Sequence, residues 1–167
     1  MKIICKNLRQ KNGVSVIEIL IVVFIIVVAL VGLVKLADLS LLSSFLAQST
    51  VQANDFAVAS LEAVRNFRDG TVWDTDGLGI LTPDISYSLQ KTGDNPPKWA
   101  LVPGQTTDLG FTRQILFSQV YRDGNDNIVT AGGVLDPDTK KVTVIVSWRE
   151  RGRNHQISLD AYLTNWQ

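Results

Sequence analysis

Gly13-Val14-Ser15-Val16-Ile17-Glu18 opens directly into an uninterrupted apolar run from Ile19 to Val34. The run has 16 residues without a charge, and the segment counted from Val14 has 21 positions. About 20 apolar residues in a helix are enough to cross the hydrocarbon core of a bilayer. Glu18 is the exception, because a carboxylate within a membrane segment costs a few kcal/mol and indicates a functional partner. The segment therefore predicts a membrane-spanning helix with one functional acid.

The residues before this segment are basic. Residues 1–13 contain no acid and four basic residues, Lys2, Lys6, Arg9 and Lys11. Because basic residues beside the first apolar segment stay in the cytoplasm, the chain after Lys35 is expected to lie outside. The predicted location is the inner (cytoplasmic) membrane, crossed once, with the leader in the cytoplasm and the C-terminus outside.

The basic leader, the glycine, the offset glutamate and the long aliphatic run together resemble the class III signal of type IV pilins and pseudopilins. In that family a membrane peptidase cuts after the glycine and usually methylates the new N-terminus. The resemblance implies that prepilin peptidase cleaves between Gly13 and Val14 and that Val14 is N-methylated. Two positions depart from the family pattern: Val14 replaces a common phenylalanine, and Ser15-Val16 replaces a common threonine-leucine pair.

Cleavage would give Val14 a free α-amino group, which is largely cationic at neutral pH. The resemblance implies that Glu18 meets the N-terminal amine of a neighbouring subunit and sets the axial register of a filament. Because desolvation offsets much of the attraction, such a pair specifies register more than it adds stability. The alternative is a signal-anchor helix whose Glu18 lies near the headgroups and reaches water.

The chain as a whole predicts an α+β fold, in which a long N-terminal helix packs on a C-terminal antiparallel β-sheet. No proline interrupts residues 14–68, and Asp69-Gly70 supplies a stop signal. The second half of the helix carries an apolar stripe at helical spacing, formed by Ala53, Phe56, Ala57, Ser60, Val64 and Phe67. The expected divisions are a cleaved leader (1–13), a transmembrane or filament-core helix (14–35), its amphipathic continuation (36–69) and an extracytoplasmic β-rich head (70–167).

Beyond residue 70 short alternating segments are separated by turn-forming residues. Alternation of apolar and polar side chains predicts strands, here at 85–89, 99–102, 111–122, 128–129, 141–149 and 156–163. Residues 123–127 and 136–139 are expected to form turns, because Asp, Asn, Gly and Pro favour turns for local reasons. This sheet against the helical stripe is also the architecture that the pilin resemblance implies.

The residues that could carry chemistry favour no enzyme, cofactor or metal site. His155 is the only histidine and is interpreted as a surface residue of a polar loop. Counted from Asp123, the sixth and twelfth positions are Ile128 and Val134, where a calcium-binding hand needs glycine and glutamate. A turn is therefore preferred for Asp123–Asn127, with calcium binding as the alternative. The aromatic residues are assigned mainly to packing, with a binding surface as the alternative.

The charge distribution does not favour nucleic acid as a partner. Removal of the leader leaves 12 basic against 16 acidic residues, a mildly acidic mature chain. Arg149, Arg151 and Arg153 form a small basic group interrupted by Glu150. The group is interpreted as a solvated hairpin tip, with contact to DNA phosphate as the alternative.

The resemblance implies a structural subunit of a type IV pilus-like filament, made as a membrane-anchored prepilin and assembled through its hydrophobic helix. Its expected partners are copies of itself, other pilins, prepilin peptidase, the inner-membrane assembly platform and membrane lipid. The final location would be a cell-surface pilus or a periplasmic pseudopilus. The lack of cysteine after Cys5 and the irregular segment 71–110 favour a minor or specialised pilin. The alternatives are a type II secretion pseudopilin and a non-pilin signal-anchor protein with a ligand-binding outer domain.

Overall fold

The computed structural model describes residue 13 and residues 15–166, so all of the expected leader except Gly13, together with Val14, lies outside the described residues. One long helix, α1 (Val16–Asp69), is followed by a short 3₁₀ helix, η1 (Leu78–Ile80), and by strands. The strands are β1 (Ser86–Lys91), β2 (Trp99–Pro103), β3 (Thr106–Asp108), β4 (Phe111–Arg122), β5 (Ile128–Val129), β6 (Val134–Glu150) and β7 (Arg153–Thr164). The chain forms two compact units, divided within α1 between Phe45 and Leu46. The expected boundary at 35/36 stays a prediction.

Helix α1 begins and ends close to its predicted limits. At its N-terminus the carbonyl of Ser15 accepts the first helical hydrogen bonds, from the amides of Glu18 (3.0 Å) and Ile19 (3.3 Å). At its C-terminus the amide of Gly70 donates to the carbonyls of Asn66 (3.1 Å) and Phe67 (3.2 Å). The glycine thus satisfies carbonyls that the last turn would otherwise leave without partners. The predicted stop at Asp69-Gly70 is confirmed.

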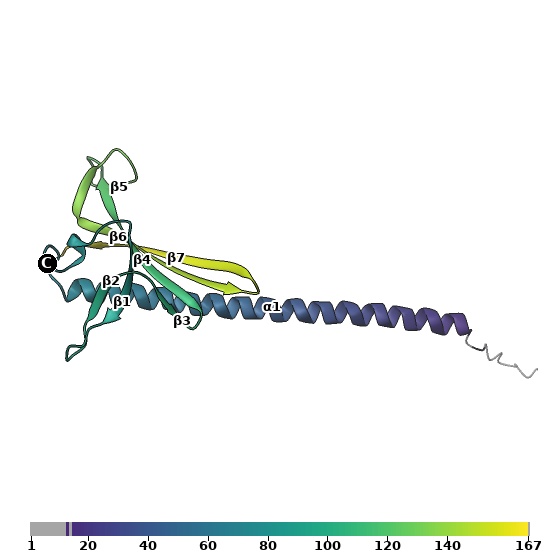
Figure 1. The fold of residues 1–167 in the computed structure, drawn as a ribbon. Coiled ribbons are helices and arrows are strands. Elements are labelled where there is room, and N and C mark those ends of the chain that lie inside the picture. Colours follow the sequence, from purple (N-terminus) through teal and green to yellow (C-terminus); the bar gives the residue numbers. More distant parts are fainter. Residues whose placement is uncertain (1–12, 14, 167) are drawn as a thin grey trace, which may run out of the picture. The chain divides into compact units, whose positions relative to one another are not determined.

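The sheet is antiparallel and is confined to the second unit. Its strand order is β2-β1-β4-β6-β7, and β3 and β5 each pair with β4 (Figure 1). The long central pair β4–β6 keeps one register from Phe111↔Trp148 to Gln119↔Lys140. One long N-terminal helix and a C-terminal antiparallel sheet confirm the α+β class at this level of detail.

The core lies between one face of the sheet and the unit-two part of α1. The helical stripe is buried as predicted at Ala53, Ala57, Ser60 and Val64, and Leu61 and Ala63 are buried beside it. Opposite them the alternating residues of β6 point inward, with Val142, Val144 and Val146 fully buried. Among the tryptophan and tyrosine side chains, Trp73, Tyr87 and Trp148 are buried, which confirms the packing role for these residues, whereas Tyr121, Tyr162 and Trp166 are exposed.

The prediction of a turn at residues 136–139 was wrong, because these residues lie within β6. The register between β4 and β6 shifts between Gln119 and Val120, so that Gln119 faces Lys140 and Val120 faces Asp136. Residues 137–139 have no partner in β4. They are held instead by a hydrogen bond from the amide of Asp138 to the Asp136 carboxylate (3.0 Å) and by the pairing of Thr139 with Thr164 of β7. The turn-forming sequence therefore makes a bulge in a continuous strand.

The hairpin from β6 to β7 is tighter than expected. Strand β7 begins at Arg153 rather than at residue 156, since the connection has only two residues, Arg151 and Gly152. Both have positive φ, 47° and 81°. Two consecutive left-handed residues are typical of a type I′ turn, whose twist matches that of the flanking strands. Strand β3 and helix η1 were not predicted, because each has only three residues.

Candidate functional site

Gly13 and Glu18 lie at the start of α1 and are the described members of the predicted processing and assembly site. Gly13 is exposed and precedes the helix, and a Cβ at this position would meet no atom within 4 Å. Its own surroundings therefore do not require glycine there. Val14, the third member of the predicted site, lies outside the described residues. The peptidase cleavage, the N-methylation and the register role stay predictions.

The Glu18 carboxylate lies in the first turn of α1 and is exposed. None of the ion pairs among the described residues includes it. A negative charge in the first turn interacts favourably with the positive end of the helix dipole. This local effect alone would suit an exposed surface helix, but here the carboxylate stands at the head of an apolar segment.

The surface around Glu18 is apolar on every side of the helix. From Val16 to Val34 every residue is exposed, and the large hydrophobic side chains have exposed fractions between 50% and 74%. A helix that is apolar all round needs lipid or other protein around it. Among the described residues, α1 is the helix long and apolar enough to cross a membrane.

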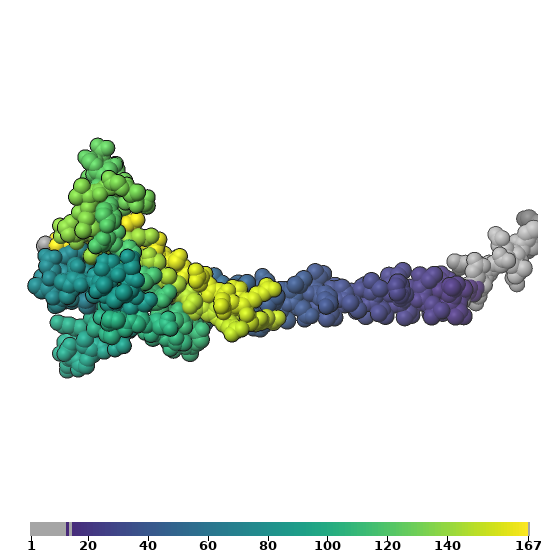
Figure 2. Space-filling view, turned by 45° about the horizontal axis from the view of Figure 1, so that its top comes forward, coloured from purple at the N-terminus to yellow at the C-terminus, as the bar shows by residue number. Residues whose placement is uncertain are grey.

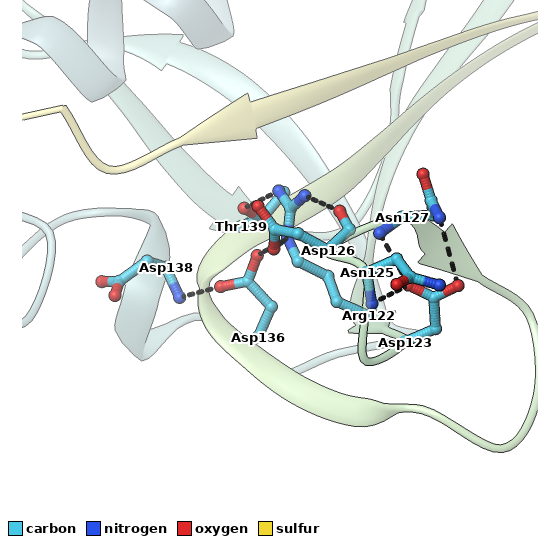
Figure 3. Close-up of polar contacts among 8 residues, drawn as sticks. All are labelled: Arg122, Asp123, Asn125, Asp126, Asn127, Asp136, Asp138 and Thr139. Atoms are coloured by element: carbon cyan, nitrogen blue, oxygen red, sulfur yellow. Dashed lines mark hydrogen bonds and ion pairs between the residues drawn. The ribbon is translucent and has the colours of Figure 1, made fainter.

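A second polar cluster lies at the end of the β4–β5 hairpin, which projects from the rest of the second unit (Figure 2). The guanidinium of Arg122 donates from Nε to Asp136 Oδ2 (2.6 Å) and from a terminal nitrogen to the carbonyl of Asp126 (2.8 Å), as Figure 3 shows. The hydrogen bond from Arg122 lowers the pKa of Asp136, with a further contribution from Thr139. The same bond raises the pKa of Arg122. The pair ties β4 to the irregular part of β6.

The neighbouring turn uses its own carboxylate. Asp123 Oδ1 accepts from the backbone amides of Asn125 and Asn127, both at 2.9 Å, and Oδ2 accepts from the Asn127 side chain at 3.2 Å. These bonds, with the Asn127 backbone amide first, lower the pKa of Asp123. The predicted turn at 123–127 is confirmed. Within the described ranges no three His, Cys, Asp or Glu side chains gather closely enough to hold a metal ion.

The prediction that His155 is a surface residue of a polar loop was wrong. His155 lies in β7, is partly buried, and stacks on Trp148 with ring centroids 5.5 Å apart and an interplanar angle of 21°. Trp148 and His155 are direct partners in the β6–β7 register. His155 is therefore part of β7, which begins at Arg153 and not at the predicted residue 156. Neither the contact between Trp148 and His155 nor the Arg122–Asp136 pair was predicted from the sequence. Residues 149–154 are all polar or glycine, so no alternation of apolar and polar side chains signalled the longer strand.

No protein-family model matches the chain, and no curated protein or solved structure matches it either.

Proposed function

We propose that this chain is a structural subunit of a type IV pilus-like filament, made as a membrane-anchored prepilin and cut after Gly13. The observation that carries the proposal is the start of α1. There Glu18 is the sole charge in a helical segment that exposes apolar side chains on all sides from Val16 to Val34. Such a segment suits two environments in turn, the bilayer before assembly and a bundle of like helices afterwards.

Glu18 gives the bundle a means of setting register. A carboxylate within an apolar bundle needs a partner, because an unpaired buried charge is strongly destabilising. Cleavage after Gly13 would supply one by releasing the amine of Val14, on an adjacent copy. A smooth apolar surface alone would allow copies to slide along each other, whereas one buried ion pair per contact selects a single axial offset.

The second unit suits a surface head. Its apolar stripe on α1 is already covered by the sheet, with Ala53, Ala57 and Val64 fully buried. The head therefore does not need the bundle to bury its core. We propose that it lies outside the membrane and is displayed on the filament, and that the chain is a minor or specialised subunit rather than the bulk one.

Expression in a host with prepilin peptidase and an assembly platform tests the proposal. The chain is expected in the filament fraction sheared from the cells, at a mass lower than that of the full translation product. Gly13→Glu should block both cleavage and recovery in filaments. Gly32→Ala is the matched control, since Gly32 is exposed in α1 and a Cβ there meets no atom within 4 Å. Wild-type recovery of Gly13→Glu in sheared filaments would contradict the proposal.

A further inference from the structure

A hollow of about 490 Å³ lies at the β6–β7 hairpin end of the sheet. In the strand register Thr112, Ser147 and Gln156 lie opposite one another, as do Arg149 and Asn154. These five side chains belong to the face opposite Phe111, Trp148 and His155, because side chains alternate along a strand; Phe111 and Trp148 are buried and His155 is partly buried. Gly110 lines the same hollow, and a Cβ at this position would meet no atom within 4 Å.

The lining of the hollow combines polar and apolar surface and carries no carboxylate; besides the five side chains above it includes Gly110, Trp148 and His155. It offers two hydroxyls, from Thr112 and Ser147, two side-chain amides, from Asn154 and Gln156, and the guanidinium of Arg149. Hydroxyls, amides and guanidinium groups are the usual donors to phosphate oxygens. The chemistry of the hollow therefore fits an anionic group that accepts several hydrogen bonds.

The hairpin adds further positive charge at this end. Arg149, Arg151 and Arg153 lie on consecutive alternate positions around the turn, and none of the ion pairs of the described residues includes any of them. By contrast, Arg122 and Lys141 on the same sheet each pair with an aspartate. The hairpin arginines thus keep their charge available to an outside partner.

Aromatic contacts between α1 and the sheet show at which end of the second unit the β6–β7 hairpin lies. Phe56 of α1 contacts Phe111 at 5.4 Å, and Phe111 contacts Trp148 at 5.7 Å between ring centroids. At the other end of β7, Trp166 lies 5.9 Å from the guanidinium of Arg68. The β6–β7 turn is therefore at the end where α1 enters the second unit, near Leu46.

Chain connectivity ties this end to the apolar helix. Leu46 follows Val34, the last residue of the apolar run, by 12 positions. Twelve residues span at most about 42 Å even when fully extended. If the run is in the bilayer, this length is the greatest distance that the connection can place between the end of the apolar run and the start of the second unit at Leu46.

We propose that the β6–β7 hairpin and its hollow bind the phosphate groups of anionic phospholipids on the outer surface of the membrane that holds the helix. The inference rests on the membrane-anchored stage of the proposed function. Basic side chains near an anionic bilayer are attracted by its surface potential. The contact holds the head against the membrane before assembly, and extraction into a filament has to break it.

Hydrogen exchange on the full-length protein in nanodiscs tests the proposal. One sample contains phosphatidylcholine alone, and the other contains phosphatidylcholine mixed with phosphatidylglycerol. Amides of residues 149–155 should exchange about fivefold more slowly in the anionic nanodiscs, the factor that one basic side chain near such a surface contributes. Raised salt should remove the difference, because the attraction is screened.

Charge-matched variants assign the effect to the hairpin. Arg149→Gln with Arg153→Gln should abolish the slowing in anionic nanodiscs. Lys91→Gln with Lys98→Gln removes the same charge from the β1–β2 hairpin and should leave the slowing intact. Equal thermal midpoints of the two double variants exclude unfolding as the cause. Slowing that survives the arginine changes would overturn the assignment.

The remaining outcomes separate this inference from the proposed function. Equal exchange in both nanodiscs, with a helix that resists carbonate extraction, overturns lipid binding and leaves the anchor standing. A chain released by carbonate overturns both. Slowing by inorganic phosphate, or by duplex DNA, in phosphatidylcholine nanodiscs without slowing by phosphatidylglycerol assigns the hairpin to another anion and overturns the lipid proposal.

Discussion

The carboxylate of Glu18 is the side chain that best distinguishes the two interpretations of this chain. The 19 residues from Val16 to Val34 hold no other charge, and no ion pair of the described residues includes this carboxylate. A carboxylate in such surroundings is costly unless it meets a cation or water. The anchor interpretation gives it water at the membrane surface, and the filament interpretation gives it an amine from another copy. The two interpretations differ in what happens when the charge is removed.

Glu18→Ala should leave membrane insertion intact and reduce incorporation into filaments to background, because a more apolar segment inserts at least as well but lacks the group that sets register. Carbonate extraction of membranes and immunoblots of sheared filaments measure the two effects. Glu62→Ala is the control, since Glu62 is an exposed carboxylate paired with Arg65 in the second half of α1. Wild-type incorporation of Glu18→Ala would contradict the register role.

The pair between Arg122 and Asp136 is expected to stabilise the second unit. Arg122→Ala removes three hydrogen bonds that connect β4 to the β5 turn and to β6. The thermal midpoint of the full-length protein in detergent should fall by roughly 2–5 °C. Arg65→Ala, which breaks an exposed pair within one helix, should change it by less than about 1 °C. Equal shifts for the two variants would show that the Arg122 network adds nothing.

The lowered pKa of Asp136 predicts a pH dependence with a definite sign. Its stabilising contribution is fully present above the unfolded value of about 3.9 and is lost as pH falls through the lower folded pKa. Asp136→Asn should therefore be less stable than the wild type near neutral pH, and the gap should close below about pH 4. Chemical denaturation at a series of pH values measures the gap. A gap that stays constant down to pH 2 would contradict this origin.

At the scale of elements, α1 was the most predictable part of the molecule. Its stripe follows from 3.6-residue spacing, and its end follows from Asp69-Gly70, so local rules were sufficient. Two small residues on the stripe, Ala53 and Ala57, are fully buried against the sheet. Their size allows helix and sheet to approach closely, and larger side chains there have nowhere to go.

Ala57→Leu should destabilise the second unit by about 1–3 kcal/mol, the usual cost of inserting methylenes into a packed core. Val58→Leu adds one methylene at the adjacent, exposed position and should be nearly neutral. Urea unfolding followed by tryptophan fluorescence reports the difference, since Trp73 and Trp148 are in the core. Similar unfolding midpoints for the two variants would show that the stripe does not pack as described.

The strands were predicted correctly where apolar and polar side chains alternate strictly. The predictions were wrong where pairing with a distant strand determines the structure. Strand β4 has the predicted bounds, and β6 contains the predicted strand segment 141–149. Residues 136–139 were misassigned because Asp and Pro favour a turn locally, whereas Thr139 pairs with β7 and Asp136 with Arg122. Partners so distant in sequence leave no local signal.

At the scale of the whole molecule, the sequence separates an apolar helix from a packed head, and both are present. The predicted processing motif could be proposed from the sequence because its residues are contiguous. The β6–β7 hollow was not, since its lining comes from three strands whose register depends on two-residue and longer turns. The hairpin arginines were identified as a group from the sequence, but only the contacts of the folded chain show that no ion pair of the described residues includes them.

The mass of the N-terminal peptide from protein made in cells with prepilin peptidase tests the central claim most directly. The filament account predicts a mature chain that begins at Val14, with or without one added methyl group, and a chain that begins at Met1 when the peptidase is absent. An N-terminal peptide that still contains Lys2 and Lys6 in peptidase-containing cells would contradict the account and leave a signal-anchor protein.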